Sequence, residues 1–136
     1  MHEPGYSVHR TRQMPGMGLI HIPVTVRLPY TADKSYSSQF LADTGATDSM
    51  APASELRQIG IKPIGVRRYE LADGAEVEYE YGLAQMEFLD EISGGIIVFG
   101  PETATPILGA TPLESAGIWI DPATHTLRKL HAVPLK

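Results

Sequence analysis

The chain is 136 residues long, contains no cysteine and carries a formal net charge of −5 at pH 7. This length suits a single domain with its own core rather than two lobes, and the lack of cysteine excludes disulfides and thiolate chemistry. The acidic balance argues against a nucleic-acid-binding surface, and no apolar run is long enough to span a bilayer, so neither nucleic acid nor membrane is expected as a partner.

The first 17 residues are rich in proline, glycine and polar groups and show no periodicity. Such a composition is typical of a flexible arm. We expect this N-terminal arm, residues 1–17, to precede one folded domain over residues 18–136. The opening segment also lacks the apolar core of a signal peptide. A cytoplasmic location is therefore expected, which the absence of cysteine permits.

Two strands are predicted before the first chemically interesting residue. Apolar and polar residues alternate over residues 20–28, the pattern of a half-buried strand. Pro23 indicates an edge position for this strand, because proline cannot donate a hydrogen bond to a neighbour. Residues 30–35 indicate a turn, and residues 36–42 form a second predicted strand that ends at Asp43.

A short helix and a hairpin are predicted next. The helix has Pro52 at its first position and Gly60 as its stop. The strands of the hairpin cover residues 66–71 and 75–82, joined at Ala72-Asp73-Gly74, and Asp-Gly between two such runs is a strong hairpin signal. The second strand alternates between two faces, with Val77, Tyr79 and Tyr81 on one and Glu76, Glu78 and Glu80 on the other.

The remaining strands are short. Residues 83–89 continue the sheet, Ser93-Gly94-Gly95 predicts a turn, and residues 96–99 form the returning strand. Further strands are predicted over residues 107–109, 118–120 and 126–130, with Asp121-Pro122 as the last turn.

A second short helix is expected directly after Gly109. Thr111 and Glu114 have the spacing of a capping box, and Pro112 fits the first helical position. The expected fold class is therefore mostly β with one or two short helices.

The run Asp43-Thr44-Gly45-Ala46-Thr47 follows the apolar end of the second strand. A carboxylate at the mouth of a core strand, beside hydroxyl groups and the backbone donors of a tight turn, is prepared for chemistry, although such a pattern by itself is usually structural. A later segment, Ile107-Leu108-Gly109-Ala110, is followed by a helix and favours a catalytic role for Asp43 over a structural one. Together the two elements resemble the retropepsin-like (clan AA) aspartic peptidases, and most closely their small stand-alone prokaryotic members. The resemblance extends over residues 20–130 and includes the apolar run 96–101.

This resemblance implies a closed retropepsin-like β-barrel, equivalent to half of a pepsin-type bilobal enzyme. Asp-Thr-Gly occurs once in the chain, so the implied enzyme is a homodimer in which each chain places its Asp43 on a twofold axis. The implied activity is that of an aspartic endopeptidase, which hydrolyses peptide or protein substrates with a water activated by both Asp43 carboxylates. No cofactor is implied. The alternatives are a catalytically weak or inactive peptide-binding or dimerisation module, and an enzyme whose monomer and dimer exchange.

The resemblance also implies supporting roles around the Asp43 loop. Thr44 would hydrogen-bond across the twofold axis, Gly45 would offer its backbone to the carboxylates, and Ala46 would complete the loop. Gly109 would pack beneath that loop. The sequence departs from the viral pattern at Ala110, where viral enzymes carry an arginine that ties the dimer together.

Substrate binding is expected from three places. Asp48 lies where retropepsin-like enzymes often bind the substrate backbone, although capping of the following helix is an equally good interpretation. Ile107 and Gly109 would line the site from the second element. The hairpin tip, Ala72, Asp73, Gly74 and Ala75, would form the flap that covers the substrate; the alternative is a surface hairpin with an acidic outer face. Its tip has fewer glycines than viral flaps.

Other candidates carry less weight. The histidines lack the His-x-x-x-His spacing of a helical metal site, so no metal is expected; they are His2, His9, His21, His125 and His131. Trp119 fits the core or a dimer interface. The pairs Arg10/Arg12 and Arg67/Arg68 are interpreted as solvated surface.

Overall fold

The computed structural model describes residues 19–121 and 123–135, and the predicted arm, residues 1–17, lies outside them. The described residues form nine strands and two short helices, which confirms a mostly β fold. In chain order these are β1 (His21–Arg27), β2 (Ser35–Ala42), β3 (Ser49–Pro52), α1 (Ala53–Gln58), β4 (Gly65–Glu70), β5 (Glu76–Phe88), β6 (Glu91–Gly100), β7 (Ile107–Leu108), α2 (Ala110–Ser115), β8 (Ile118–Asp121) and β9 (Thr126–Lys129).

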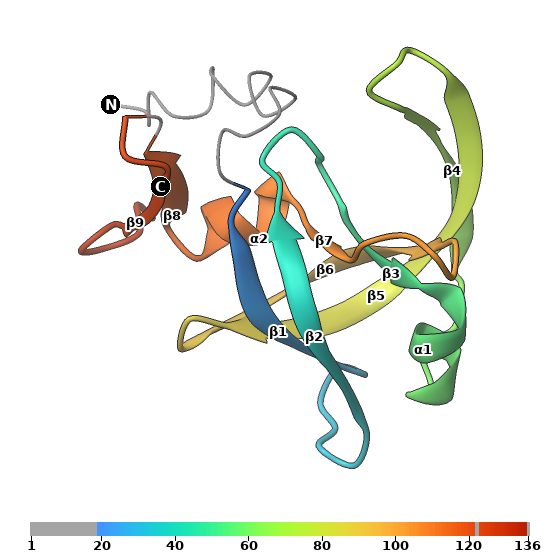
Figure 1. Cartoon of the computed structure of the whole chain (residues 1–136). Helices are drawn as coiled ribbons and strands as arrows, with labels where there is room; N and C mark the ends of the chain where they lie inside the picture. The colour runs from blue at the N-terminus through green and yellow to red at the C-terminus, as the bar shows by residue number, and fades with distance from the viewer. Residues whose placement is uncertain (1–18, 122, 136) are drawn as a thin grey trace.

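Six of the strands close a ring. The order of the seven-stranded sheet is β1-β2-β7-β3-β6-β5-β4, and β1 also pairs with β5, so that within this sheet β4 lies outside the closed circuit. The hairpin of β4 and the first half of β5 projects from this ring as an arm (Figure 1). The separate β8–β9 pair stands at the opposite side of the ring.

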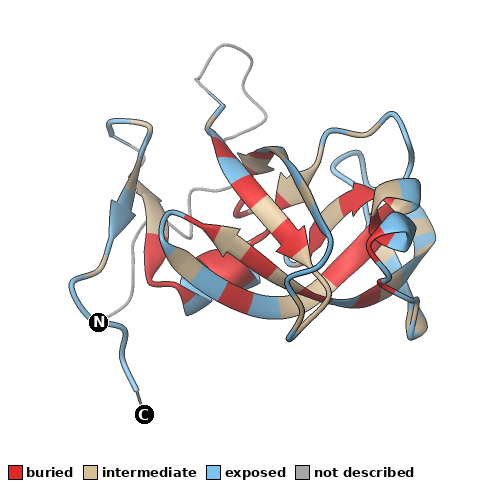
Figure 2. Cartoon of the chain, turned by 90° about the horizontal axis from the view of Figure 1, so that it is seen from below, coloured by how far each residue is buried: buried red, intermediate tan, exposed pale blue. Residues whose placement is uncertain are grey.

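The core fills the inside of the ring. Ile22, Val24 and Val26 on β1 are at most 5% exposed, as the alternation of this strand predicts. Phe40 on β2 and Leu113 on α2 are fully buried with them. Figure 2 shows buried and exposed positions alternating along the ring strands. Removal of these apolar side chains from water is the main force that closes the ring.

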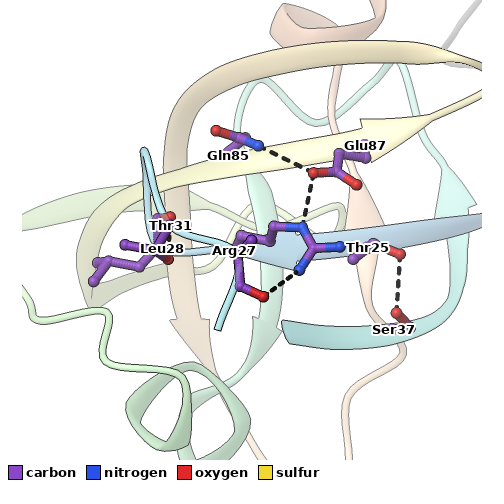
Figure 3. A network of polar contacts seen from close by, with 8 residues as sticks. Thr25, Arg27, Leu28, Thr31, Ser37, Gln85 and Glu87 are labelled. Carbon is purple, nitrogen blue, oxygen red and sulfur yellow. Dashed lines mark hydrogen bonds and ion pairs between the residues drawn. The ribbon is translucent and has the colours of Figure 1, made fainter. Parts of the chain in front are cut away.

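Polar side chains close the junction between β1 and β5 (Figure 3). Glu87 on β5 accepts hydrogen bonds from Arg27 Nε at 2.8 Å and from Gln85 Nε2 at 3.0 Å. On the other side of β1, the hydroxyl groups of Thr25 and Ser37 lie 2.9 Å apart and join it to β2. Pro23 occupies the part of β1 that pairs with β2 alone, which agrees with the predicted edge position.

The hairpin predicted at Ala72-Asp73-Gly74 is confirmed. The backbone N–H of Leu71 donates to the carbonyl of Ala75 at 2.8 Å, and the N–H of Gly74 donates back to Leu71 at 2.9 Å. Gly74 has a φ of +89°, a left-handed conformation that glycine adopts without the usual steric cost. Asp73 also fits the turn, since its Oδ1 accepts the N–H of Ala75 at 2.9 Å.

Both helices begin differently from their sequence predictions. Pro52 precedes α1 as its N-cap residue, and a carboxylate distant in sequence, Glu102, accepts the N–H of Ser54 at 2.9 Å and bonds its hydroxyl group. The capping box predicted at Thr111 and Glu114 is wrong, because α2 begins at Ala110 with Gly109 as its N-cap and no capping side chain. The backbone donors at this end are used by the Asp43 loop instead, as described below.

Two strand predictions also need correction. The turn expected at Ser93-Gly94-Gly95 lies inside β6, since β5 and β6 turn at Leu89 and Asp90, both with positive φ. Register explains this shift, because Phe88 pairs with Glu91 and extends the ladder to its end. The four-residue strand β3 has no sequence prediction; it is defined by parallel pairing with β6 and a contact with β7.

Candidate active site

Asp43 lies where β2 ends against β7. The two strands are parallel there, with Ala42 opposite Leu108, and the N–H of Asp43 donates to the carbonyl of Leu108 at 3.0 Å. The loop then folds back: the N–H of Gly45 donates to Asp43 Oδ1 at 3.0 Å, and the N–H of Ala46 donates to the carbonyl of Asp43 at 3.1 Å. Asp43 and Thr44 are each 7% exposed. The chain thus presents a buried carboxylate with a backbone donor fixed beside it.

The start of α2 locks this loop from below. The N–H of Ala110 donates to the carbonyl of Ala46 at 2.7 Å, and the N–H of Gly109 donates to Ser49 Oγ at 3.0 Å. Gly109 lies so close to the loop that a Cβ there would stand 2.7 Å from the backbone carbonyl of Asp48. Only glycine permits this approach. The two sequence motifs, residues 43–47 and residues 107–110, therefore form one packed unit.

A cavity of about 440 Å³ opens between this loop and the inner face of the β4–β5 hairpin. Four of the predicted site residues line it: Gly45, Ala46, Asp48 and Ile107. The hairpin contributes strand residues rather than its tip, so that Ala72, Asp73, Gly74 and Ala75 are not among the lining residues. Asp43, Thr44 and Gly109 are not in this lining either, and belong to the buried framework next to Gly45.

Further lining residues have no sequence prediction as site residues: Thr47, Met50, Arg67, Arg68, Glu70, Leu71 and Val98, together with Tyr69. Tyr79, which the alternation of the second hairpin strand places on the face of Val77 and Tyr81, also lines the cavity. Alternation along β4 could have identified part of this set, because Arg67 and Tyr69 share a face and pair with Tyr79 and Val77 of β5.

Asp48 joins the loop to the hairpin. Its Oδ2 accepts hydrogen bonds from Tyr69 Oη at 2.7 Å and from Arg67 Nη1 at 3.1 Å. Burial is the main cause that raises the pKa of Tyr69 above its ordinary value, and the hydrogen bond to Asp48 is the second. The phenol therefore remains a donor at neutral pH. The interpretation of Asp48 as a helix cap is wrong, because β3 follows it directly. Arg67 is likewise more than solvated surface.

The outer face of the hairpin is acidic and exposed, as the alternation predicts. Glu78 and Glu80 there pair with Arg68 and Arg57, at 3.3 Å and 2.9 Å. Trp119 on β8 is half-buried, with the Arg128 guanidinium 6.0 Å from its ring centroid. Glu78, Glu80 and Trp119 do not line the cavity, whereas Arg68 reaches it from the edge of this face.

Among residues 19–121 and 123–135, no group of three or more histidine, aspartate or glutamate side chains is arranged to hold a metal ion. In the same part of the chain, neither helix has the length and apolar character needed to cross a bilayer. Comparison with models of known protein families gives no match, and none of the curated proteins compared matches the chain.

Proposed function

We propose that this protein is an aspartic endopeptidase of the retropepsin-like type, active as a homodimer. The observation that carries the proposal is the packing of the Asp43 loop on Gly109 beside a cavity roofed by a hairpin. A single chain supplies one Asp-Thr-Gly. The second carboxylate therefore comes from the Asp43 of another copy, related by a twofold axis.

The proposed mechanism follows from the chemistry of two adjacent carboxylates. Like charges about 3 Å apart cannot both ionise, so the pair shares one proton. The ionised carboxylate takes a proton from the water between them, and the water oxygen attacks the peptide carbonyl carbon. The protonated partner gives its proton to the carbonyl oxygen, which produces a gem-diol. As the C–N bond breaks, the carboxyl that took the water proton passes it to the leaving nitrogen, and the partner recovers a proton from a gem-diol hydroxyl, so that the pair again holds one proton. The N–H of Gly45, which donates to Asp43 Oδ1 at 3.0 Å, fixes the orientation of this carboxyl group.

The substrate in this proposal is an extended peptide between the Asp43 loop and the β4–β5 hairpin, which acts as the flap. Such a peptide would add its backbone hydrogen bonds to the strands around it, as in other strand-addition complexes. The apolar side chains of Met50, Val98 and Ile107 would then contact alternate side chains of the peptide. The strands of the hairpin, rather than its tip, would make most of the contact.

The test is digestion of a denatured protein and a peptide library over about pH 3 to 7, a range that spans the upper titration step of such dyads. Asp43→Asn should lower cleavage by at least about 10²-fold, the lower end of what an acid–base group contributes. Asp33→Asn is the matched control, since Asp33 is exposed in the β1–β2 turn, at the opposite end of β2 from the Asp43 loop. Equal cleavage by Asp43→Asn and wild type would overturn the proposal.

A peptide-binding or dimerisation module without turnover is the second candidate. Ala110 favours it, because this position lacks the arginine that ties viral dimers together, and the hairpin tip takes no part in the cavity. Binding of library peptides to wild type and Asp43→Asn alike, with no cleavage by either, is the result that would support this candidate.

A further inference from the structure

The carboxylate of Asp48 lies at the contact between the candidate flap and the Asp43 loop. Its side chain is 7% exposed and receives two donors from one strand, β4: the phenol of Tyr69 and the guanidinium of Arg67. A buried carboxylate without donors would be strongly disfavoured, because its lost hydration would not be replaced. If the hairpin separated from the loop, the carboxylate of Asp48 would lose both donors and would have no hydrogen-bond partner there until water replaced them.

The inner face of the hairpin holds both donors in place. Strand alternation puts Arg67 and Tyr69 on the same face, where the ladder sets them opposite residues of β5. The Arg67 guanidinium stacks over the ring of Tyr81, 4.8 Å from its centroid, and the ring of Tyr69 lies 6.4 Å from that of Tyr79. These contacts restrict the donors before they meet Asp48, which lowers the entropy lost in the bond.

The acceptor is equally restrained. The backbone of Thr47 and Asp48 lies against Gly109, and the N–H of Thr111 donates to the carbonyl of Thr47 at 3.2 Å. Ser49, next in the chain, is fully buried and accepts the N–H of Gly109. Asp48 therefore belongs to the same packed unit as Asp43.

We propose that Asp48, Arg67 and Tyr69 form a latch that holds the β4–β5 hairpin over the Asp43 loop. Tyr69 and Arg67 are positioning residues in this assignment, and Asp48 is their acceptor rather than a group offered to the substrate backbone. The role of the latch in catalysis rests on the proposed function, whereas its role in holding the hairpin does not.

Hydrogen exchange in the absence of substrate tests the latch directly. Tyr69→Phe removes the donor and keeps the ring, so the amides of β4 and of residues 76–81 should exchange about tenfold faster, a ratio equivalent to about 1.4 kcal/mol. Tyr79→Phe is the matched control, since it removes a hydroxyl from the same cavity that makes no hydrogen bond within the described residues. Exchange in β1 should be unchanged in both variants.

Two more variants keep the test decisive if Tyr69→Phe folds poorly. The first is Asp48→Asn, which retains the acceptor shape but weakens the bond to Arg67, and should speed hairpin exchange by a smaller factor. The second is loss of the charge in Arg67→Met, with Arg67→Lys as its conservative counterpart: exchange should be faster in Arg67→Met than in Arg67→Lys, because lysine keeps a charged donor for Asp48. The latch is overturned if hairpin exchange in both Tyr69→Phe and Asp48→Asn equals that of wild type, or if Tyr79→Phe accelerates it equally.

Kinetics provide a separate readout. Loss of the latch should raise KM about tenfold with a smaller change in kcat. Without the latch, part of the free energy of substrate binding would be used to order the hairpin, and the net affinity would fall. A merely structural defect would instead lower the active fraction and leave KM unchanged. Absence of cleavage by wild type would refute the proposed function and leave the exchange result standing; normal exchange in the variants would refute the latch alone.

Discussion

At the scale of single residues, Gly109 is the position with the least tolerance. Its N–H bonds Ser49, and the space where a Cβ would lie is occupied by the backbone of Thr47 and Asp48. Backbone atoms cannot rotate away as the end of a flexible side chain can. The packing of the loop that carries Asp43 therefore depends on the absence of a side chain at this position.

Gly109→Ala should lower the free energy of unfolding by about 1–3 kcal/mol, the usual cost of an overpacked site. Urea unfolding followed by tryptophan fluorescence and circular dichroism measures this loss, and cleavage should fall with it. Gly95→Ala is the control, because nothing lies within 4 Å of the Cβ it would introduce. Similar losses for the two variants would show that close packing at Gly109 is not the cause.

The site residues differ in how far the sequence reveals them. Asp43 and Gly109 lie in short motifs whose local order fixes their surroundings, and both occupy the same packed unit in the structure. Asp48 is adjacent in sequence, yet its partners Arg67 and Tyr69 are 19 and 21 residues away. No local pattern predicts which face of the hairpin meets which loop, so this cluster was accessible only from the folded chain.

At the scale of elements, periodicity identifies the long strands and the hairpin well. The alternation in β1 predicts its buried face, and Asp73-Gly74 predicts the turn between β4 and β5. Elements defined by distant partners are a different matter. The sequence of β3, Ser-Met-Ala-Pro, has no alternation that would indicate its pairing with β6. The glycines of β6 have the composition of a turn, but the register with β5 places them inside the strand.

The β1–β5 junction makes its own prediction about pH. The hydrogen bond from Arg27, with a smaller one from Gln85, holds the pKa of Glu87 below its ordinary value. A carboxyl group whose pKa is lower in the folded state than in the unfolded state stabilises the fold at pH values above its unfolded-state pKa. This stabilisation is lost as the pH falls through the folded-state pKa. Glu87→Gln should therefore cost up to about 1 kcal/mol at neutral pH, as for other partly exposed ion pairs, and less as the solution becomes more acidic.

Urea unfolding at neutral and acidic pH measures this difference between Glu87→Gln and wild type. Glu114→Gln is the control, since Glu114 is exposed on α2 and its side chain has no ion pair within the described residues. A difference that stays constant with pH would mean that the ionised Glu87 does not stabilise the ring closure.

At the scale of the whole molecule, the proposed enzyme contains one catalytic carboxylate per chain and needs two. Activity should then rise faster than in proportion to protein concentration where monomer and dimer exchange. Sedimentation velocity over the same concentrations should show the change in mass. The two curves should share a midpoint if the dimer is the active species.

Mixing of chains tests the shared site more sharply. Once the subunits have exchanged, equal amounts of wild type and Asp43→Asn should reduce wild-type activity to about half, because random pairing puts half of the wild-type chains with an inactive partner. Dilution with a protein that does not associate is the control for crowding and adsorption. Undiminished activity in the mixture, with exchange shown by differently labelled chains, would refute a site built from two copies.

Strand β5 extends without interruption for 13 residues, and its first part belongs to the projecting arm whereas its last part closes the ring against β1. Its one glycine, Gly82, is wedged against the carbonyl of Lys62 and the side chain of Ile61. The strand is therefore continuous from the hairpin into the ring rather than two segments joined by a hinge. A ligand bound at the Asp73 turn would therefore lie on the same unbroken strand as the β1–β5 junction while making no contact with the lining of the cavity.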